Sequence, residues 1–198
     1  MHRFLSPILI FAGSITSYAG ACPAWERLPV KLFNDAGTEP AILNAAKSEA
    51  GWLVKSLCIE VAWVPCPLIT VTNAVPCQAP PGAIELHVLS DTASSDPSAN
   101  SLGISIPKTG ASRAAVFLER VRELAAANEG IIDAGGLLGH VMAHEIGHLL
   151  LRSTAHSSEG IMRAEFRRSD LKKAAQRQFR FTPEQVESIR RTAYSRGR

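Results

Sequence analysis

The most constraining feature of this 198-residue chain is the segment 132–151. It is apolar along most of its length, yet it contains three histidines and one glutamate. The apolar residues are not confined to one side of a helix, which is typical of a helix that is buried all round. The sequence therefore predicts a long buried helix that carries a small group of ionisable side chains.

Within this segment lies the motif His144-Glu145-Ile146-Gly147-His148. Residues four apart share one face of a helix, so the two imidazoles can converge on one ion, and Zn²⁺ suits such nitrogen ligands. Glu145 lies one step round the helix, where its carboxylate can act as a general base toward a water held by the metal. The motif predicts amide hydrolysis, with His144 and His148 as metal ligands and Glu145 as the catalytic residue. The alternative is a chance match on an unrelated helix.

A catalytic zinc also needs a third protein ligand and an open position for water. The candidates downstream of the helix are His156, Glu159, Glu165 and Asp170. We prefer His156, because it follows the expected helix end and the chain can turn back toward the metal there.

His140 complicates this interpretation, because it lies four residues before His144 on the same helical face. A His140–His144 pair could bind a metal as well, but Glu145 would then have no recognisable role. We therefore interpret His140 as a structural residue or a supporting residue behind the ligands.

The run HEIGHLLLRSTAHSSEGIM, residues 144–162, resembles the metzincin clan of zinc metallopeptidases. Their pattern is HExxHxxGxxH, followed by a tight turn that contains a methionine beneath the metal. The resemblance implies His144, His148 and His156 as zinc ligands, Glu145 as general base and Met162 as the turn methionine. It also implies one metzincin-like domain with a twisted, mostly parallel sheet, a backing helix, an active-site helix and a C-terminal helix.

Two positions depart from that pattern. His156 falls eight residues after His148 instead of six, and Arg152 lies near the place of the family's helix-ending glycine. Arginine adopts left-handed backbone angles less readily than glycine. The loop that carries His156 is therefore expected to differ in shape from the family's loop.

The rest of the sequence predicts strands and two helices before the buried helix, and an irregular segment followed by one helix after it. Strands are expected over 28–33, 58–64, 83–89, 102–106 and 114–118, and helices over 38–55, 119–127, 132–151 and 183–194. The proline-rich stretch 65–81 and the polar stretch 90–101 are expected to be loops. This order indicates an α/β (α+β) fold with a single domain over 22–198.

Residues 1–21 have the pattern of a signal peptide, with a positive start, an apolar run and small residues at Ala19 and Ala21. The apolar run is shorter than the roughly 20 residues that span a bilayer, which makes a membrane anchor the weaker interpretation. A lipoprotein beginning at Cys22 is another alternative, although Ala19 replaces the large aliphatic residue usual before a lipidated cysteine. The prediction is a secreted or periplasmic protein with no transmembrane segment in its mature form.

Four cysteines follow, and an even number in an exported protein favours disulfides. Three connectivities are possible. Our hypothesis is that Cys66 pairs with Cys77, which would staple a loop, and Cys22 with Cys58. A zinc site made of cysteines is disfavoured, because no two of them lie close together in the sequence.

Positive charge is concentrated beyond Leu151, where Lys and Arg outnumber Asp and Glu by 12 to 5. An affinity for nucleic acid or anionic polymers is one interpretation of this excess. A solvated helical face is preferred, because no aromatic residues interleave with the charges, so no nucleic-acid partner is expected.

The sequence thus predicts a monomeric zinc endopeptidase that takes a peptide or protein substrate, bound in extended form along the strand 102–106. One alternative is an inactive binding module whose structural zinc takes Glu159 or Glu165 as a fourth ligand. Another is a zinc hydrolase of a non-peptide amide or ester.

Overall fold

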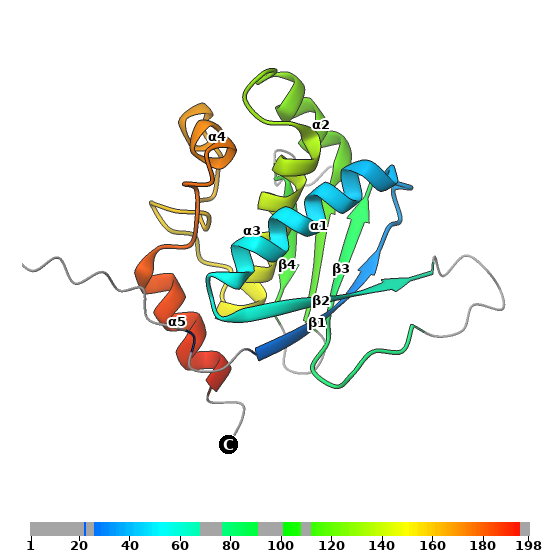
Figure 1. Cartoon of the computed structure of the whole chain (residues 1–198), viewed down its shortest axis with the longest axis vertical. Coiled ribbons are helices and arrows are strands. Elements are labelled where there is room, and N and C mark those ends of the chain that lie inside the picture. The colour runs from blue at the N-terminus through cyan, green and yellow to red at the C-terminus, as the bar shows by residue number, and fades with distance from the viewer. Residues whose placement is uncertain (1–21, 23–25, 68–76, 91–100, 108–111, 195–198) are drawn as a thin grey trace, which may run out of the picture.

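A mostly parallel sheet and the helices packed on one of its faces form the body of the protein (Figure 1). The computed structural model describes residue 22 and the ranges 26–67, 77–90, 101–107 and 112–194. The strands are β1 (Glu26–Phe33), β2 (Ile59–Cys66), β3 (Ile84–Leu89), β4 (Gly103–Ile106) and β5 (Arg113–Phe117). The helices are α1 (Pro40–Lys55), α2 (Leu118–Ala126), α3 (Ala134–Leu151), α4 (Arg168–Ala175) and α5 (Pro183–Tyr194). The α/β fold expected from the sequence is confirmed.

The five strands lie in the order β2-β1-β3-β5-β4. All neighbouring pairs are parallel except β4 and β5, which are antiparallel. Among the described strands, β4 pairs only with β5 and therefore forms an edge of the sheet. Helix α3 contacts β4 and β5, while α1 contacts β2.

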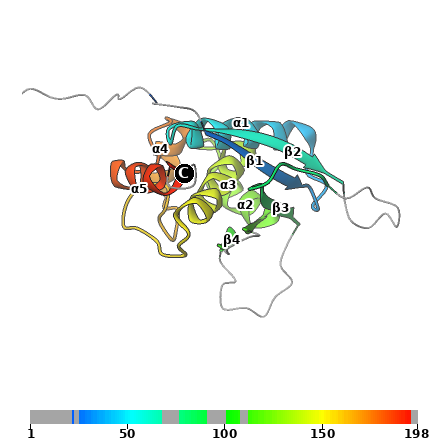
Figure 2. The same ribbon diagram turned by 90° about the horizontal axis from the view of Figure 1, so that it is seen from below.

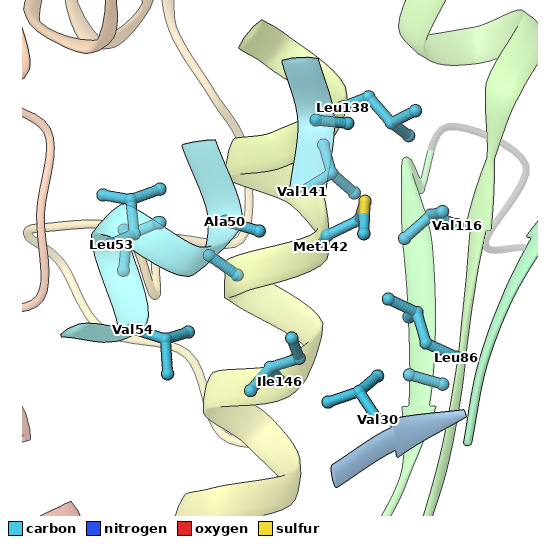
Figure 3. Close-up of a cluster of buried hydrophobic side chains, with 14 of the residues drawn as sticks. Val30, Ala50, Leu53, Val54, Leu86, Val116, Leu138, Val141, Met142 and Ile146 are labelled. Carbon is cyan, nitrogen blue, oxygen red and sulfur yellow. The ribbon is translucent and has the colours of Figure 1, made fainter. Parts of the chain in front are cut away.

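One hydrophobic core joins the sheet to α1 and α3 (Figure 3). Alternate strand residues point at the helices, and Val30, Leu86 and Val116 are fully buried. Each such side chain contributes about 1.5–3 kcal/mol through its removal from water. The opposite face of the sheet is more polar and includes an ion-paired row of Lys31, Glu85 and Arg113.

Helix α3 is buried at nearly every position, because other elements enclose it (Figure 2). It contacts α1, two strands, α2, α4 and α5. A Cβ atom at Gly139 would lie 2.6 Å from the Glu49 Cβ and 2.8 Å from the Ala46 carbonyl oxygen of α1. The glycine therefore allows the two helix backbones to approach each other closely.

Most expected elements are present with small shifts at their ends. Helix α3 begins at Ala134 instead of residue 132, because the Asp133 side chain caps it by accepting a hydrogen bond from the Gly136 N–H. The C-terminal helix is confirmed, and Thr182 and Gln185 cap it reciprocally through their side chains.

Two expected element boundaries were wrong, and one helix was missed. Helix α1 begins at Pro40, with Glu39 as its N-cap, instead of at residue 38. Strand β2 continues to Cys66 into the expected loop, which an edge strand tolerates because Pro65 need not donate to a partner on its free side. Helix α4 was missed, because it is short and highly charged; buried Asp170 caps its first turn by accepting from the Arg167 N–H. Residues 91–100 lie outside the described residues.

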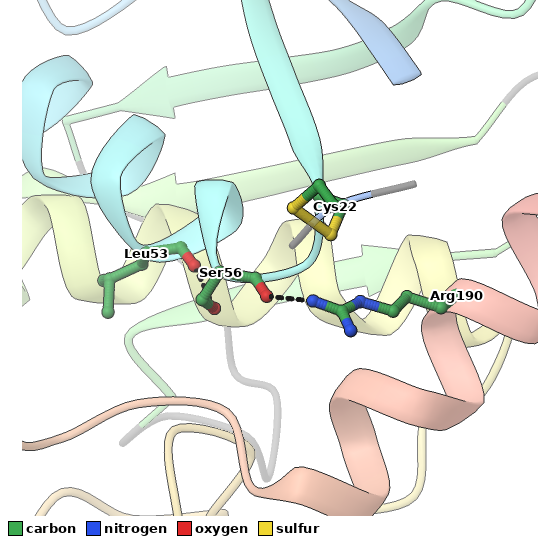
Figure 4. Close-up of a disulfide and its surroundings, with 5 residues drawn as sticks. Cys22, Leu53, Ser56 and Arg190 are labelled. Carbon is green, nitrogen blue, oxygen red and sulfur yellow. Dashed lines mark hydrogen bonds between the residues drawn. A yellow bond between two sulfur atoms is a disulfide. The ribbon is translucent and has the colours of Figure 1, made fainter. Parts of the chain in front are cut away.

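Two disulfides join Cys22 to Cys58 and Cys66 to Cys77, as the pairing hypothesis had it. The first lies where α1 leads into β2, close to the point where Arg190 of α5 donates a hydrogen bond to the Ser56 carbonyl at 3.1 Å (Figure 4). Since a disulfide sulfur cannot also carry a lipid, the pairing argues against the lipoprotein alternative. Among the described residues, no helix combines the length and apolar character needed to cross a membrane.

Some basic side chains of the C-terminal segment pack against other parts of the protein. The guanidinium groups of Arg177 and Arg180 lie 4.8 and 4.4 Å from the ring centre of Trp52. Arg163 also lies 3.6 Å from the carboxylate of Asp170. These contacts give several of the basic residues an intramolecular role.

The close approach of α1 and α3 leads to a stability prediction. Gly139→Ala should lower the free energy of unfolding by about 1–3 kcal/mol, because the added methyl overlaps α1 atoms that cannot move independently. Gly136→Ala is the matched control, since its Cβ would meet nothing closer than 3.4 Å. It should leave stability unchanged or raise it by up to about 1 kcal/mol through better helix propensity. Chemical denaturation of both variants measures the difference, and equal effects would contradict close packing at Gly139.

Candidate metal centre

Three histidine side chains converge at the C-terminal half of α3. His144 and His148 come from the helix and His156 from the loop that follows it. The His148 Nε2 atom lies 3.0 Å from the His144 Nε2 and 3.3 Å from the His156 Nε2. All the potential ligand atoms lie within 4.8 Å of one another. The group could hold a metal ion, and three imidazole nitrogens are a donor set that suits zinc.

Backbone carbonyls orient two of these rings. The His144 Nδ1 lies 2.7 Å from the Ile161 carbonyl oxygen, and the His148 Nδ1 lies 2.7 Å from that of Ser153. Because a carbonyl only accepts, each Nδ1 carries the hydrogen and each Nε2 keeps its lone pair free for an ion. The resting tautomers are thus those of metal-ligating histidines.

Burial keeps the helical imidazoles neutral. It lowers the pKa of His144 to about 4, and the neighbouring His148 and His156 act in the same direction, while the hydrogen bond to Ile161 opposes them. Burial also lowers the pKa of His148. Protons therefore compete weakly with a metal for these two nitrogens near neutral pH.

Glu145 lies beside the histidine group without joining it. Its Oε1 is 4.0 Å from the His144 Nε2, and its Oε2 is buried and has no hydrogen-bond partner in the described part of the chain. Burial raises the pKa of Glu145 to about 8, and a hydrogen bond from the Ser105 side chain opposes that rise. The carboxyl group can therefore take up and release a proton near neutral pH.

The edge strand β4 runs directly against this carboxyl group. A Cβ atom at Gly103 would lie 2.6 Å from the Glu145 Oε1 and 2.8 Å from the Ala115 carbonyl oxygen of β5. Only glycine fits this place without displacing one of its neighbours. The sequence analysis expected a strand here but missed Gly103 and Ser105 as site residues, because nothing in the local pattern shows which helix a strand will contact.

The loop after α3 begins at Arg152 and carries His156. Arg152 ends the helix in the left-handed conformation, with φ 51° and ψ 39°, where glycine would be free of strain. The Ser153 N–H donates to the His148 carbonyl at 3.2 Å, while the Ser153 carbonyl accepts from the His148 ring. The nonstandard loop therefore supplies a backbone partner that orients one of the histidines.

Met162 packs against helix α3 at Gly147, next to His148 in the chain. It is 1% exposed, and a Cβ atom at Gly147 would lie 2.5 Å from its sulfur and 2.8 Å from the Phe181 ring. A hydrogen bond of 2.9 Å from the Ser157 N–H to the Met162 carbonyl closes the turn between His156 and Met162. The methionine thus occupies a tight turn packed on the helix that carries the site.

The other sequence candidates lie elsewhere. Within the described ranges, no carboxylate joins the three histidines to form a larger metal-binding group. Glu159 and Glu165 are exposed, and Asp170 is engaged in capping α4. His140 stands apart from the group, with its Nδ1 3.0 Å from the Gly136 carbonyl oxygen.

Comparisons with known proteins support the architecture. No protein-family model and no curated protein sequence matches the chain. A crystal structure of archaemetzincin from Methanopyrus kandleri aligns with a TM-score of 0.55 and 14% identity, over 88% of this chain and 99% of that one. The chain has an archaemetzincin-like α/β fold. Metalloproteinase-II from Bacteroides fragilis aligns over 86% of this chain and 53% of its own, at 12% identity and a TM-score of 0.49.

The buried carboxyl group predicts a pH-dependent stability of the metal-free protein. Burial raises the pKa of the Glu145 carboxyl group from an ordinary value of 4.5 to about 8, so the folded state keeps a proton that the unfolded state releases between these values. Its contribution to stability is therefore complete below pH 4.5 and is lost as the pH rises toward 8. A glutamine at this position does not titrate. The free energy of unfolding of Glu145→Gln relative to that of the native protein should therefore increase between pH 5 and pH 8, by on the order of 2 kcal/mol.

Urea denaturation in the presence of a chelator measures this difference. Glu159→Gln, at an exposed position, is the control and should follow the native pH profile. Parallel pH profiles for the native protein and Glu145→Gln would contradict a protonated buried carboxyl group.

Proposed function

We propose that this chain is a zinc-dependent metalloendopeptidase, with His144, His148 and His156 as metal ligands and Glu145 as the general base. The observation that carries the proposal is the meeting of three imidazoles, two of them oriented by backbone carbonyls, with a buried carboxyl group that stays outside the ligand set. The archaemetzincin-like fold supports it.

The residues fit a catalytic zinc better than a structural one. Structural zinc sites are closed by four protein ligands, whereas catalytic sites have three and an open position. Among the described residues only the three histidines converge. This favours an enzyme over the zinc-stabilised binding module, which would need Glu159 or Glu165 as a further ligand.

Zinc bound here would lower the pKa of a coordinated water toward about 7 and polarise the substrate carbonyl. The positive charge of a bound metal would favour the carboxylate form of Glu145, which would then accept a proton from the attacking water and pass it to the leaving amine. Its Oε2 has no hydrogen-bond partner among the described residues, so this oxygen can hold the transferred proton. The carbonyls of Ile161 and Ser153 keep the hydrogens of His144 and His148 on Nδ1 throughout.

The position of β4 favours a peptide substrate over a small amide or ester. The strand forms an edge of the described sheet and lies directly against Glu145. An extended peptide that pairs with this edge by backbone hydrogen bonds would lie next to the Glu145 carboxyl group. The substrate class proposed is therefore extended peptide or an unfolded segment of a protein.

An oxidising compartment outside the cytoplasm is the proposed location. The two disulfides support it, because such bonds persist mainly in secreted and periplasmic proteins. The signal peptide proposed for residues 1–21 lies outside the described residues.

Zinc content and cleavage of a mixed peptide library test this function. The native protein should bind one zinc and cleave peptides, while Glu145→Gln should keep the zinc and lose at least 10²-fold in kcat/KM. His156→Ala should lose both zinc affinity and cleavage, and Glu159→Gln should behave as the native protein. If the proteins retain zinc and none of them cleaves peptides, the result would favour the binding module. If His156→Ala keeps full zinc affinity, His156 is not the third ligand.

A second prediction concerns the contact between β4 and the base. Gly103→Ala should reduce kcat/KM by on the order of 10²-fold while zinc affinity is retained, because the methyl displaces Glu145 or the strand by about 1 Å. Gly51→Ala on α1 is the matched control, since a Cβ atom there would meet nothing within 4 Å. Unchanged activity in Gly103→Ala would show that this contact does not position the base.

A further inference from the structure

The two edges of the described sheet differ in how they are protected. Strand β2 forms one edge and β4 the other (Figure 2). Strand β2 carries an exposed charge at Glu60 and an exposed proline at Pro65. Charged residues and prolines hinder an edge strand from pairing with another chain. The four residues of β4 include neither, so this edge is open to pairing with a further strand.

Strand β4 also carries exposed apolar side chains. Ile104 and Ile106 are each 47% exposed, and they are the two large hydrophobic side chains exposed among the residues that the structure describes. Because side chains alternate along a strand, both point to the sheet face opposite α3, whereas Gly103 and Ser105 point toward the helix. The register partner of Ile104 on β5 is Ala115, whose methyl group is too short to cover it. Two exposed isoleucines on one open edge indicate a surface that another chain covers.

The charges beside Ile106 limit what that chain can present there. Its register partner on β5 is Arg113, whose side chain is 62% exposed. The Arg113 guanidinium lies 2.7 Å from the Glu85 carboxylate, and the Lys31 ammonium lies 3.5 Å from the same carboxylate. Two cations thus share one carboxylate, and this row of the sheet carries a net positive charge. A basic side chain next to Ile106 would therefore be disfavoured.

We propose that β4 selects extended peptides that have aliphatic side chains at two positions separated by one residue. The inference rests on the proposed peptidase function and names the substrate class of that site. A peptide strand antiparallel to β4 would place alternate side chains opposite Ile104 and Ile106, with Cβ atoms about 4.5–5.5 Å apart. The side chain between these two would point to the other face, where the Glu145 carboxyl group lies against β4.

A second copy of the chain is the other candidate occupant of this edge. Strand β4 is four residues long, so two paired copies would share few backbone hydrogen bonds. A peptide would gain more, because its backbone could also reach the metal centre beside Glu145. The peptide is therefore the occupant to which the proposal commits.

Cleavage-site profiling of a proteome-derived peptide library tests the proposal. For the zinc-loaded native protein, Ile, Val and Leu should be enriched about threefold or more at two positions separated by one residue, and Lys and Arg should be depleted at one of them. Ile104→Lys should replace the aliphatic preference at one position by a preference for Asp and Glu. Ile106→Lys should do so at the other position, two residues away. Zinc content and urea denaturation show whether each variant is folded.

Glu60→Gln is the matched control, because it changes the net charge by the same amount as each lysine variant. It lies at the opposite edge of the described sheet and should leave the cleavage profile unchanged. Native cleavage without the paired aliphatic preference would overturn the proposal and leave the peptidase function standing. The same profile in the native protein and in both lysine variants would overturn it as well.

Peptide binding tests the same surface without cleavage, so that failure of the proposed function is a separate result. Three fluorescein-labelled heptapeptides carry two valines, two glutamates or two lysines, in each case separated by one serine. Fluorescence anisotropy with zinc-loaded Glu145→Gln should show the valine peptide binding about fivefold or more tightly than the lysine peptide. Adding Ile104→Lys to this variant should make the glutamate peptide the tightest. Equal affinities for all three peptides would overturn the proposal, whether or not the native protein cleaves peptides.

Sedimentation velocity distinguishes the peptide from a second copy of the chain. The native protein should sediment as a monomer, as should Ile104→Lys. A native dimer that Ile104→Lys dissociates would assign the β4 edge to self-pairing and would overturn the proposal.

Discussion

Close backbone approach around α3 is the constraint on which the rest of the structure depends. The helix is enclosed by α1, the sheet and the C-terminal helices, and its glycines are where its neighbours come closest. Gly139 faces the backbone of α1, and Gly147 faces Met162 and Phe181. A larger side chain at either place would push a neighbour away from the helix that carries two of the three histidines.

The same enclosure determines the electrostatics of the site. Histidines and a glutamate removed from water lose the solvation of their charged forms, so the imidazoles stay neutral and the carboxyl group tends to keep its proton. If they were exposed to solvent, the His144 and Glu145 side chains would carry charge over a wider range of pH. Their chemistry near neutral pH thus follows from the packing of an apolar helix around them.

Much of this fold could be predicted from the sequence, because hydrophobic periodicity reports local structure directly. Strands, the long buried helix and the capped C-terminal helix are short-range features, and the motif of His144, Glu145 and His148 is contained within two turns. The short spacing of eight positions from His148 to His156 also favoured the third histidine as a ligand. Helix α4 escaped prediction, because a short charged helix owes its stability to tertiary contacts such as those of buried Asp170.

The residues that were missed depend on contacts between distant parts of the chain. Gly103 resembles any small residue near a turn until β4 is placed against α3. His140 was recognised in the sequence as a structural or supporting residue, but its neighbour Glu49 becomes evident only when α1 packs on α3. Neither contact leaves a periodic signal, so only the folded arrangement identifies them.

The contact at Gly103 also bears on how such a protein can evolve. The carboxyl group of Glu145 rests against the backbone of β4, whereas Ile104 and Ile106 project from the strand into solvent, each 47% exposed. Mutations at these two isoleucines can alter which partners the edge strand favours while the carboxyl group keeps its place. In the proposed enzyme, selectivity and reactivity would thus depend on alternate positions of one short strand, so selection could act on one without disturbing the other.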